Sequence, residues 1–271
     1  MVSKPLVKNE KIHAGSAKAT LSLDNGQSLS AGLVVAADGA HSPLRTLLNI
    51  PVRAWEYGHD AIVCTVQMEK PHHATAYQRF TRYGPVAFLP LESSTADASI
   101  CTIVWSQDKA RAAELLALDE DDFCQELAAA IEYRLGDVKA VSRRQAFPLR
   151  QMHALEYTRP NVVLVADAAH TIHPLAGQGI NLGLADVAEL VKTINEALEA
   201  EKLISDERLL KRYQRRRKTG NLAMMAIMEG FKRIYQPLPL PAMLLRNEGM
   251  NFLDKHYLLK QKIIRYAMGV E

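Results

Sequence analysis

Cysteine is scarce in this sequence, and long apolar runs are missing. The three cysteines, Cys64, Cys101 and Cys124, are far apart and form no CxxC pair. They therefore predict neither a disulfide framework nor a zinc knuckle, and we expect a reducing, cytoplasmic compartment. No segment approaches the roughly 18 consecutive apolar residues of a membrane-spanning helix. Residues 1–5 lack the apolar core of a secretory signal.

Compositional bias is also absent. Apolar residues make up 48% and charged residues 23% of the 271 positions, with 14 glycines and 12 prolines. These values are ordinary for globular proteins and argue against collagen-like or low-complexity chains. The length suits one large domain or two small ones.

Charge is divided unevenly along the chain. Residues 211–271 hold 13 Lys and Arg against 4 Asp and Glu. Such a basic segment is either an ordinary solvated helix face or a contact with an anionic membrane surface or an acidic partner protein. We expect no nucleic-acid partner.

The order of the predicted elements indicates a mixed α/β fold. Alternating residues on both sides of Asn25-Gly26 predict a β-hairpin, since this pair tolerates positive φ at both turn positions. A strand buried on both faces is predicted at 33–37, ending at Asp38. An antiparallel sheet is expected from four runs, at 61–68, 76–81, 85–91 and 99–106.

The second half of the sequence is mainly helical in pattern. Helices are predicted at 108–118 and 121–135, followed by a strand at 140–147 that rejoins the sheet. A second doubly buried strand, at 161–166, ends at Asp167. Further helices are expected at 179–200, at 206–235, and from residue 242 to the end.

The stretch from Val162 to Asp186 carries the strongest chemical signal. A buried strand ends in the carboxylate of Asp167, and a loop then closes on Gly177-Gln178-Gly179 at a helix start. This order places one acidic acceptor and several free backbone N–H groups around one concavity. Such a site suits a ligand with hydroxyl groups and an electron-rich or anionic ring.

Other interpretations of the same residues stay open at this level. Gly177, Gly179 and Gly183 form GxGxxxG, one residue longer than the dinucleotide pattern GxGxxG, so the glycines alone are a weak signal. Asp38 and Asp167 could simply cap helices or turns. His170 and His173 have no further ligand at a convincing spacing, and we expect no metal.

Two motifs resemble those of the aromatic-ring flavin hydroxylases. Residues 37–45 resemble the GADGxxSxxR motif, with matches at Asp38, Gly39, Ser42 and Arg45. The later stretch resembles GDAAHxxxPxxGQGxNxGxxDA. Its matches are Asp167, Ala168, Ala169, His170, Pro174, Gly177, Gln178, Gly179, Asn181, Gly183 and Asp186.

Within this group the sequence is similar to the ubiquinone-biosynthesis hydroxylases of the UbiH/UbiF/UbiI type, and the similarity covers nearly all the chain. The resemblance implies the C-terminal portion of a p-hydroxybenzoate-hydroxylase-like FAD-binding fold, with an antiparallel substrate-domain sheet and C-terminal helices. The implied domains are an FAD-binding part in two pieces, a substrate-binding sheet, and a basic helical region. Their ranges are 1–58 with 151–205, 59–150, and 206–271.

The resemblance also implies roles for single residues. Asp167 would accept hydrogen bonds from the ribityl hydroxyls of FAD, and Pro174 would lie near the reactive flavin face. Asp38, Gly39 and Arg45 would serve the pyrophosphate region and the nicotinamide nucleotide. The helix start would face the pyrimidine edge of the flavin, where reduced flavin is negative. Its residues are Gly177, Gln178, Gly179, Ile180 and Asn181.

The reaction implied by the family is hydroxylation of a polyprenylated phenol. FAD is reduced by NAD(P)H and reacts with O₂ to give a flavin C4a-hydroperoxide, which hydroxylates the aromatic ring. The residues identify no catalytic base. The basic C-terminal helices, which also carry apolar side chains, would contact the inner membrane surface or a ubiquinone-biosynthesis complex.

The sequence departs from the family in what it lacks. It contains neither GxGxxG nor the acidic residue that follows it by about 20 positions. Ala37 and Ala166 stand where the family has glycine. Two hypotheses follow: an N-terminally truncated form of an active hydroxylase, or a catalytically inactive remnant that acts as a scaffold subunit.

Overall fold

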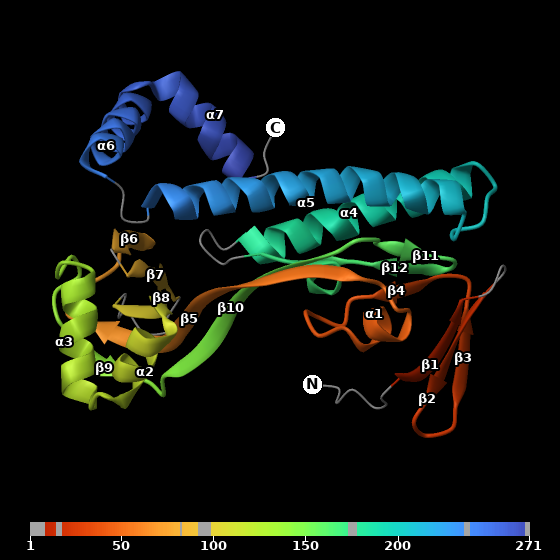
Figure 1. Cartoon of the computed structure of the whole chain (residues 1–271), viewed down its shortest axis with the longest axis horizontal. Helices are drawn as coiled ribbons and strands as arrows, with labels where there is room; N and C mark the ends of the chain where they lie inside the picture. The colour runs from red at the N-terminus through yellow and green to blue at the C-terminus, as the bar shows by residue number, and fades with distance from the viewer. Residues whose placement is uncertain are drawn as a thin grey trace. The chain divides into compact units, whose positions relative to one another are not determined.

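The computed structural model describes residues 9–14, 18–81, 83–91, 99–172, 178–235 and 239–268. The chain forms two compact units, whose elements are labelled in Figure 1. Unit 1 comprises residues 1–55, 150–232 and 241–271, and unit 2 comprises residues 56–149 and 233–240. The chain passes from one unit to the other four times: within strands β5 and β10, near the end of helix α5 and at the start of helix α6.

Unit 1 begins with a three-stranded antiparallel sheet. Its strands are β1 (Asn9–Ala14), β2 (Ala19–Leu23) and β3 (Ser28–Ala31). Strands β2 and β3 pair antiparallel, which confirms the predicted hairpin, although Gly26 alone of the Asn25-Gly26 pair has positive φ, at +80°. Strand β1 has no counterpart in the sequence-based prediction.

A second small sheet brings two distant segments together. Strand β4 (Val34–Ala36) pairs in parallel with β12 (Val162–Leu164), and β11 (Thr158–Arg159) pairs antiparallel with β12. Parallel pairing puts the carboxyl ends of β4 and β12 next to each other. Residues of β12 are fully buried, as predicted. For β4 the prediction of two buried faces is wrong, because Val35 is 44% exposed.

The remaining elements of unit 1 are mostly helices. Helix α4 is amphipathic, and α5 runs alongside it (Figure 1). Tyr213 of α5 is buried, and its hydroxyl donates to the Leu164 carbonyl oxygen at 3.0 Å, which ties α5 to the parallel strands. These elements are α1 (Pro43–Leu47), the 3₁₀ turn η1 (Ala166–Ala168), β13 (His170–Thr171), α4 (Gln178–Glu199), α5 (Glu207–Tyr235), α6 (Leu240–Lys255) and α7 (Tyr257–Met268).

None of the helices in the described part of the chain is both long enough and apolar enough to span a bilayer.

The large sheet has the order β13-β10-β5-β8-β7-β6, with β9 pairing with β5. Strand β8 pairs antiparallel with β5 and β7, as do β6 with β7, β9 with β5 and β13 with β10, which confirms the predicted antiparallel sheet. Its strands are β5 (Val52–Met68), β6 (Tyr77–Thr81), β7 (Gly84–Pro90), β8 (Ile100–Asp108), β9 (Val138–Val141) and β10 (Gln145–Ala154).

The predicted strand at 140–147 is wrong as a single element. Residues 142–144 separate β9 from β10. The reason is local: the backbone N–H of Ser142 donates to the Thr65 carbonyl oxygen, and the Ser142 hydroxyl accepts from the Thr65 N–H at 2.9 Å. A side chain thus replaces a backbone partner at this point, and the strand is interrupted.

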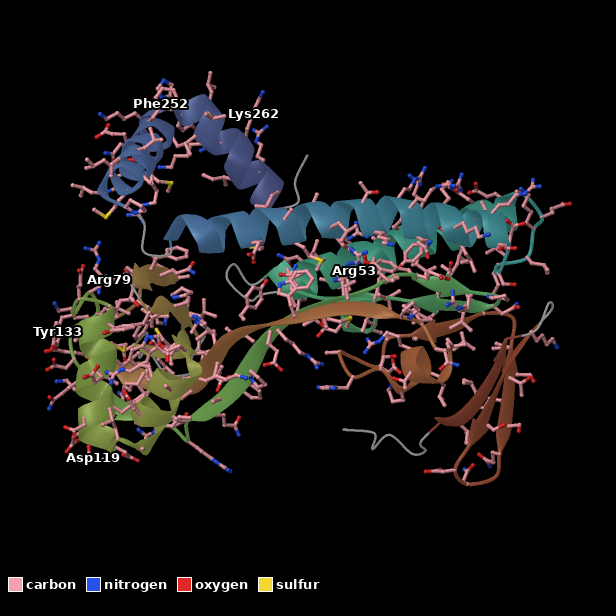
Figure 2. All side chains as sticks on the ribbon, in the orientation of Figure 1. Arg53, Arg79, Asp119, Tyr133, Phe252 and Lys262 are labelled. Atoms are coloured by element: carbon pink, nitrogen blue, oxygen red, sulfur yellow. The ribbon has the colours of Figure 1, made fainter. Side chains whose placement is uncertain are left out.

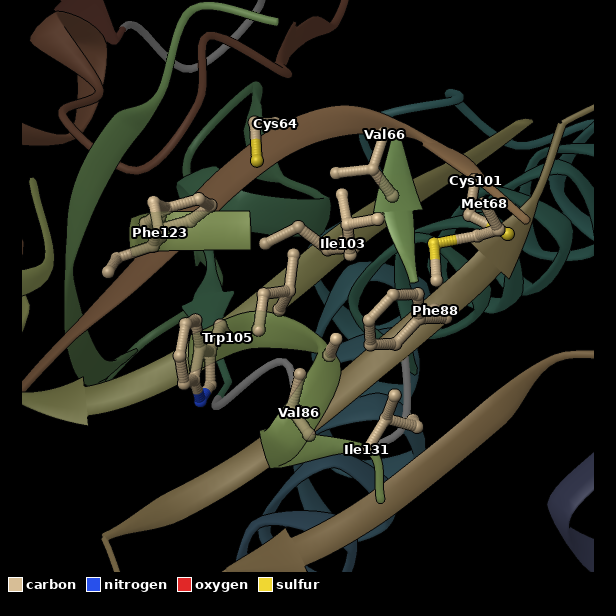
Figure 3. Close-up of a cluster of buried hydrophobic side chains, with 14 of the residues drawn as sticks. Cys64, Val66, Met68, Val86, Phe88, Cys101, Ile103, Trp105, Phe123 and Ile131 are labelled. Atoms are coloured by element: carbon tan, nitrogen blue, oxygen red, sulfur yellow. The ribbon is translucent and has the colours of Figure 1, made fainter. Parts of the chain in front are cut away.

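Helices α2 (Lys109–Ala117) and α3 (Glu120–Ala130) pack on one face of the unit 2 sheet. Each is capped by an aspartate, Asp108 or Asp119, whose carboxylate accepts from a backbone N–H of the first turn. Helix α3 ends earlier than the predicted 121–135, because Glu132 and Tyr133 have positive φ. Buried side chains fill the space between sheet and helices (Figure 3), among them Val86, Phe88, Ile103, Trp105, Phe123 and Leu127.

Gly84 at the start of β7 gives a test of this packing. Its φ is +146°, and an added Cβ would lie 2.1 Å from the backbone oxygen of Ser106. Backbone atoms cannot move aside as a side chain can. We therefore expect Gly84→Ala to lower the free energy of unfolding by more than about 3 kcal/mol, measured by urea denaturation.

Gly58→Ala is the matched control. Gly58 also has positive φ, at +69°, but nothing lies within 4 Å of an added Cβ. Its substitution should lower the free energy of unfolding by only about 1 kcal/mol, through conformational strain. Equal losses in the two variants would contradict the steric explanation for Gly84.

Candidate functional site

A pocket of about 620 Å³ opens in unit 1 at the carboxyl ends of β4 and β12, beside the start of α4. Its volume lies within the range of small-molecule sites. We call it the α4 pocket. It is lined by Ala37, Gly39, Val165, Ala166, Asp167, Thr171, Ile172, Gly179, Ile180, Gly183, Leu184 and Val187.

Polar groups in the α4 pocket are available to a ligand. The carboxylate of Asp167 is exposed and makes no hydrogen bond to a described residue. The hydroxyl oxygen of Thr171 is buried and has no partner in the described part of the chain. Helix α4 begins at Gln178, so the positive end of its dipole lies at the pocket. The pocket thus offers an anionic acceptor, a hydroxyl and a helix N-terminus.

The rest of the lining is largely apolar. Ile180 is 76% exposed, Leu184 62% and Val187 44%, and all three line the pocket. Their spacing of four and three residues places them on one face of α4. Exposed apolar side chains gathered in this way usually mark a surface that receives a ligand or a partner.

The floor of the pocket depends on a close approach between α4 and the turn η1. A Cβ on Gly183 would lie 2.9 Å from the Cβ of Ala166. Only glycine therefore fits at position 183 without a shift of the backbone. Ala166 itself has φ +51°, a left-handed conformation that costs an alanine free energy.

A buried carboxylate, Asp186 of α4, holds this strained turn in place. Its Oδ2 accepts from the Ala166 backbone N–H at 3.0 Å and from His170 Nε2 at 2.6 Å. Its Oδ1 accepts from Arg217 Nε at 2.6 Å and from Asn221 Nδ2 at 3.3 Å. Through these four bonds Asp186 joins η1 to both long helices.

Burial alone would raise the pKa of Asp186. The hydrogen bonds and charges of His170 and Arg217 outweigh burial, and its pKa lies below the usual value for aspartate. Asp186 is therefore ionised at neutral pH, as an acceptor-only group requires.

The segment 37–45 is held against the same turn. Arg45 is buried, and its guanidinium donates to the carbonyl oxygens of Ala168 and Ala40, both at 2.8 Å. Burial lowers the pKa of Arg45 despite the nearby charge of Asp38. Asp38 accepts from the Leu44 N–H at 3.0 Å. Both residues thus have structural uses, and their direct contact with a cofactor stays a prediction.

The structure brings four of the predicted site residues to one pocket: Gly39, Asp167, Gly179 and Ile180. Asn181 follows them in the first turn of α4, where it is exposed. The predictions for Pro174 and Gly177 lie outside the described residues, as does that for the side chain of Gln178.

Several functional residues were missed by sequence reasoning. Leu184 and Val187 follow Ile180 at helical spacing, a signal that could have marked them as one face. Thr171 gives no comparable signal. Arg217 belongs to a run of basic residues, a pattern that usually indicates a solvated helix face, yet its side chain bonds to Asp186. Among the described residues no cluster of three metal-binding side chains exists.

The Asp186 interactions give a prediction with a pH dependence. Removing one partner of a buried ion pair leaves the other uncompensated, so we expect Asp186→Asn to lower the free energy of unfolding by about 3 kcal/mol near pH 7. Because the pKa of Asp186 is lower when folded, its contribution is complete above about pH 4 and is lost as the pH falls through the folded value. The difference between variant and wild type should shrink in that acidic range, measured by urea unfolding.

Asp254→Asn serves as the control. Asp254 also has a lowered pKa, through its bond to Lys260, but it is fully exposed. Exposed pairs add little to stability, and this variant should unfold like the wild type. An Asp186→Asn protein as stable as the wild type near neutral pH would show that the buried pair does not hold the turn.

Comparison with known proteins places this geometry in a family. Residues 8–227 match the family described as FAD binding domain. The 3-demethoxyubiquinol 3-hydroxylase of Escherichia coli (strain K12) is 37% identical over 250 residues, which are 92% of this chain and 62% of that protein. The mitochondrial ubiquinone biosynthesis monooxygenase COQ6 of Homo sapiens is 32% identical, over 91% of this chain and 59% of that protein. The chain thus spans about three fifths of the length of these curated relatives.

Solved structures share the fold at low sequence identity. The p-nitrophenol 4-monooxygenase PnpA from Pseudomonas putida DLL-E4 has a TM-score of 0.73 at 17% identity, over 95% of this chain and 64% of that chain. The Diels-Alderase PyrE3 of pyrroindomycin biosynthesis has a TM-score of 0.70 at 16% identity, over 98% and 56%. The fold is therefore that of the FAD-dependent monooxygenases, as the resemblance of the two motifs implied. The match over residues 8–227 shows that the chain belongs to the FAD binding domain family.

Proposed function

We propose that the α4 pocket holds the isoalloxazine ring and ribityl chain of FAD. The observation that carries this proposal is the carboxylate of Asp167, which has no hydrogen-bond partner among the described residues and lines the same pocket as the first residues of α4. A carboxylate suits ribityl hydroxyls, and a helix N-terminus suits the edge of a ring that becomes anionic on reduction. Apolar side chains of α4 suit the flat face of the ring.

Each residue predicted to bind the flavin has a role in this proposal. Asp167 accepts from the ribityl hydroxyls, and the Thr171 hydroxyl, which has no partner among the described residues, is a further partner. The first turn of α4 offers its N–H groups to the pyrimidine edge. Pro174 and Gly177, which lie outside the described residues, keep their predicted roles at the flavin ring, with Gln178 and Gly179 at the start of α4. Gly39, Asp38 and Arg45 remain the candidates for the pyrophosphate side and for NAD(P)H.

We infer further that the whole protein is a flavin-dependent monooxygenase that hydroxylates a polyprenylated phenol with NAD(P)H and O₂. The names of the relatives support this class of substrate. FAD, when bound, supplies the redox chemistry. The chain's own residues hold the ring and keep water from it. In unit 2, Leu89 and Leu91 are about two fifths exposed and offer an apolar wall for a prenylated ring.

Riboflavin is the direct probe of this proposal, because it contains the ring and ribityl chain but no pyrophosphate. We expect riboflavin to bind the purified chain, with quenching of flavin fluorescence. Addition of FAD should give a protein that absorbs at about 450 nm. Asp167→Ala removes a charged acceptor and should weaken riboflavin binding by about tenfold or more.

Asp121→Ala is the matched control, since Asp121 is an exposed aspartate in the first turn of α3. It should leave riboflavin affinity unchanged. If neither flavin binds at saturating concentration, the α4 pocket of this chain is not a flavin site. If both variants bind equally well, Asp167 is not a ligand.

We also propose that α6 and α7 contact an anionic membrane surface. Their exposed apolar residues include Leu245 (76%) and Leu258 (80%). Figure 2 labels Phe252 on α6 and Lys262 on α7, an apolar and a basic side chain of this region. Between residues 240 and 268 there are five Lys or Arg and two Asp or Glu. Apolar area combined with positive charge is the pattern of interfacial helices.

Vesicle sedimentation tests the membrane proposal. The chain should sediment with phosphatidylglycerol vesicles and much less with phosphatidylcholine vesicles. The double variant Leu245→Glu, Leu258→Glu should bind about tenfold more weakly, because both apolar contacts are lost. Leu203→Glu is the control, since Leu203 is 67% exposed but lies outside these helices. Equal sedimentation of both variants would exclude α6 and α7 as the contact.

A further inference from the structure

A second pocket, of about 420 Å³, lies in unit 2 and shares no residue with the α4 pocket. We call it the Trp105 pocket. It opens on the face of the sheet that α2 and α3 cover, since Arg111 of α2 and Glu126 of α3 line it together with residues of β6 and β8. Three aromatic side chains contribute to its lining: Phe80, Tyr83 and Trp105.

Two residues that line this pocket each hold a buried polar atom without a partner among the described residues. These atoms are the indole nitrogen Nε1 of Trp105 and the amide oxygen Oε1 of Gln107. Trp105 is 4% exposed and Gln107 is 2% exposed, so bulk water does not reach them freely. An unmatched buried donor beside an unmatched buried acceptor costs folding free energy. Both groups lie on β8, two residues apart, and therefore on one face of the sheet.

Neighbouring groups do not satisfy this pair. Asp60 is the cross-strand partner of Gln107, but its Oδ1 is itself a buried acceptor that no described residue satisfies. Arg79 donates to the Ala130 carbonyl oxygen and to Glu132, and Arg111 donates to Glu114 and Glu126. The guanidinium groups are therefore occupied by carboxylates and by backbone.

The orientation of the indole is fixed by packing. The rings of Trp105 and Phe123 meet edge to face, with centroids 5.9 Å apart (Figure 3). Arg144 lies over the Phe123 ring at 4.8 Å. Because this contact holds the ring, the indole N–H keeps one direction, which is a property of a prepared binding group.

We propose that the Trp105 pocket is a binding site for a small phenol, separate from the flavin chemistry of unit 1. A hydroxyl is the simple group that both accepts from an indole N–H and donates to an amide oxygen. The aromatic lining suits a planar ring. An anion fits less well, because the arginines are already paired with carboxylates and the unmatched amide oxygen would repel it.

Indole NMR tests this proposal directly. The sequence has two tryptophans, so Trp55→Phe leaves Trp105 as the only indole signal. In this ¹⁵N-labelled protein, phenol should shift the Trp105 Nε1–H peak in a saturable way. Anisole cannot donate, and toluene can neither donate nor accept. Each should bind about tenfold more weakly than phenol or worse.

Gln107→Met tests the acceptor with little change of shape. It should weaken phenol binding by about tenfold, since the hydroxyl then loses its acceptor. Gln145→Met is the control at an exposed position outside the pocket and should leave affinity unchanged. The comparison of phenol with anisole needs no variant and so remains valid if Gln107→Met folds poorly.

Three results would overturn the proposal. One is a Trp105 peak that phenol does not shift. Another is an equal shift by phenol, anisole and toluene, which would mean an apolar surface without a hydroxyl site. The third is an exchange cross-peak between the Trp105 N–H and water that phenol leaves unchanged, which would mean that a fixed water satisfies the pair.

Discussion

The carboxylate of Asp186 is the point on which the geometry of unit 1 depends. It is fully buried, and its two oxygens accept four hydrogen bonds, one of them from the backbone of the strained turn that carries Asp167. Among the described residues, only backbone contacts of the turn otherwise support the left-handed conformation of Ala166, such as the bond from the Ala169 N–H to the Ala166 carbonyl oxygen. Strain at a functional turn is maintained by the surrounding structure, and here a single side chain supplies much of that support.

The sequence predicted this site well where the signal was local. The hairpin at Asn25-Gly26, the helix beginning near Gly179 and the turn residue Asp167 all follow from short patterns whose physical cause lies within a few residues. The parallel pairing of β4 with β12 joins segments more than 120 residues apart. Residues of both motifs, 37–45 and 162–186, line one pocket, although no local pattern predicts that these two strands pair.

Contacts between residues that lie far apart in the sequence could not be predicted from local sequence patterns. Arg217 sits among four consecutive basic residues, and no pattern distinguishes it from Arg216, which pairs with Glu189 near the surface. The exposed face of β4 and the break at Ser142 were also missed, because each depends on a partner far away in the chain. The likeness to both a monooxygenase and a Diels-Alderase shows why fold alone does not decide the reaction.

The bonds from Arg217 and Asn221 also set a lower limit on the size of any independent module that would carry the proposed flavin site. These residues lie some 50 positions after Asp167, on a helix that carries no pocket residue of its own. A module engineered to end after α4 would keep every pocket residue identified here, but it would expose the Asp186 carboxylate and release the turn beneath the ligand. Such a module must therefore include helix α5, although none of the described residues of α5 lines the pocket.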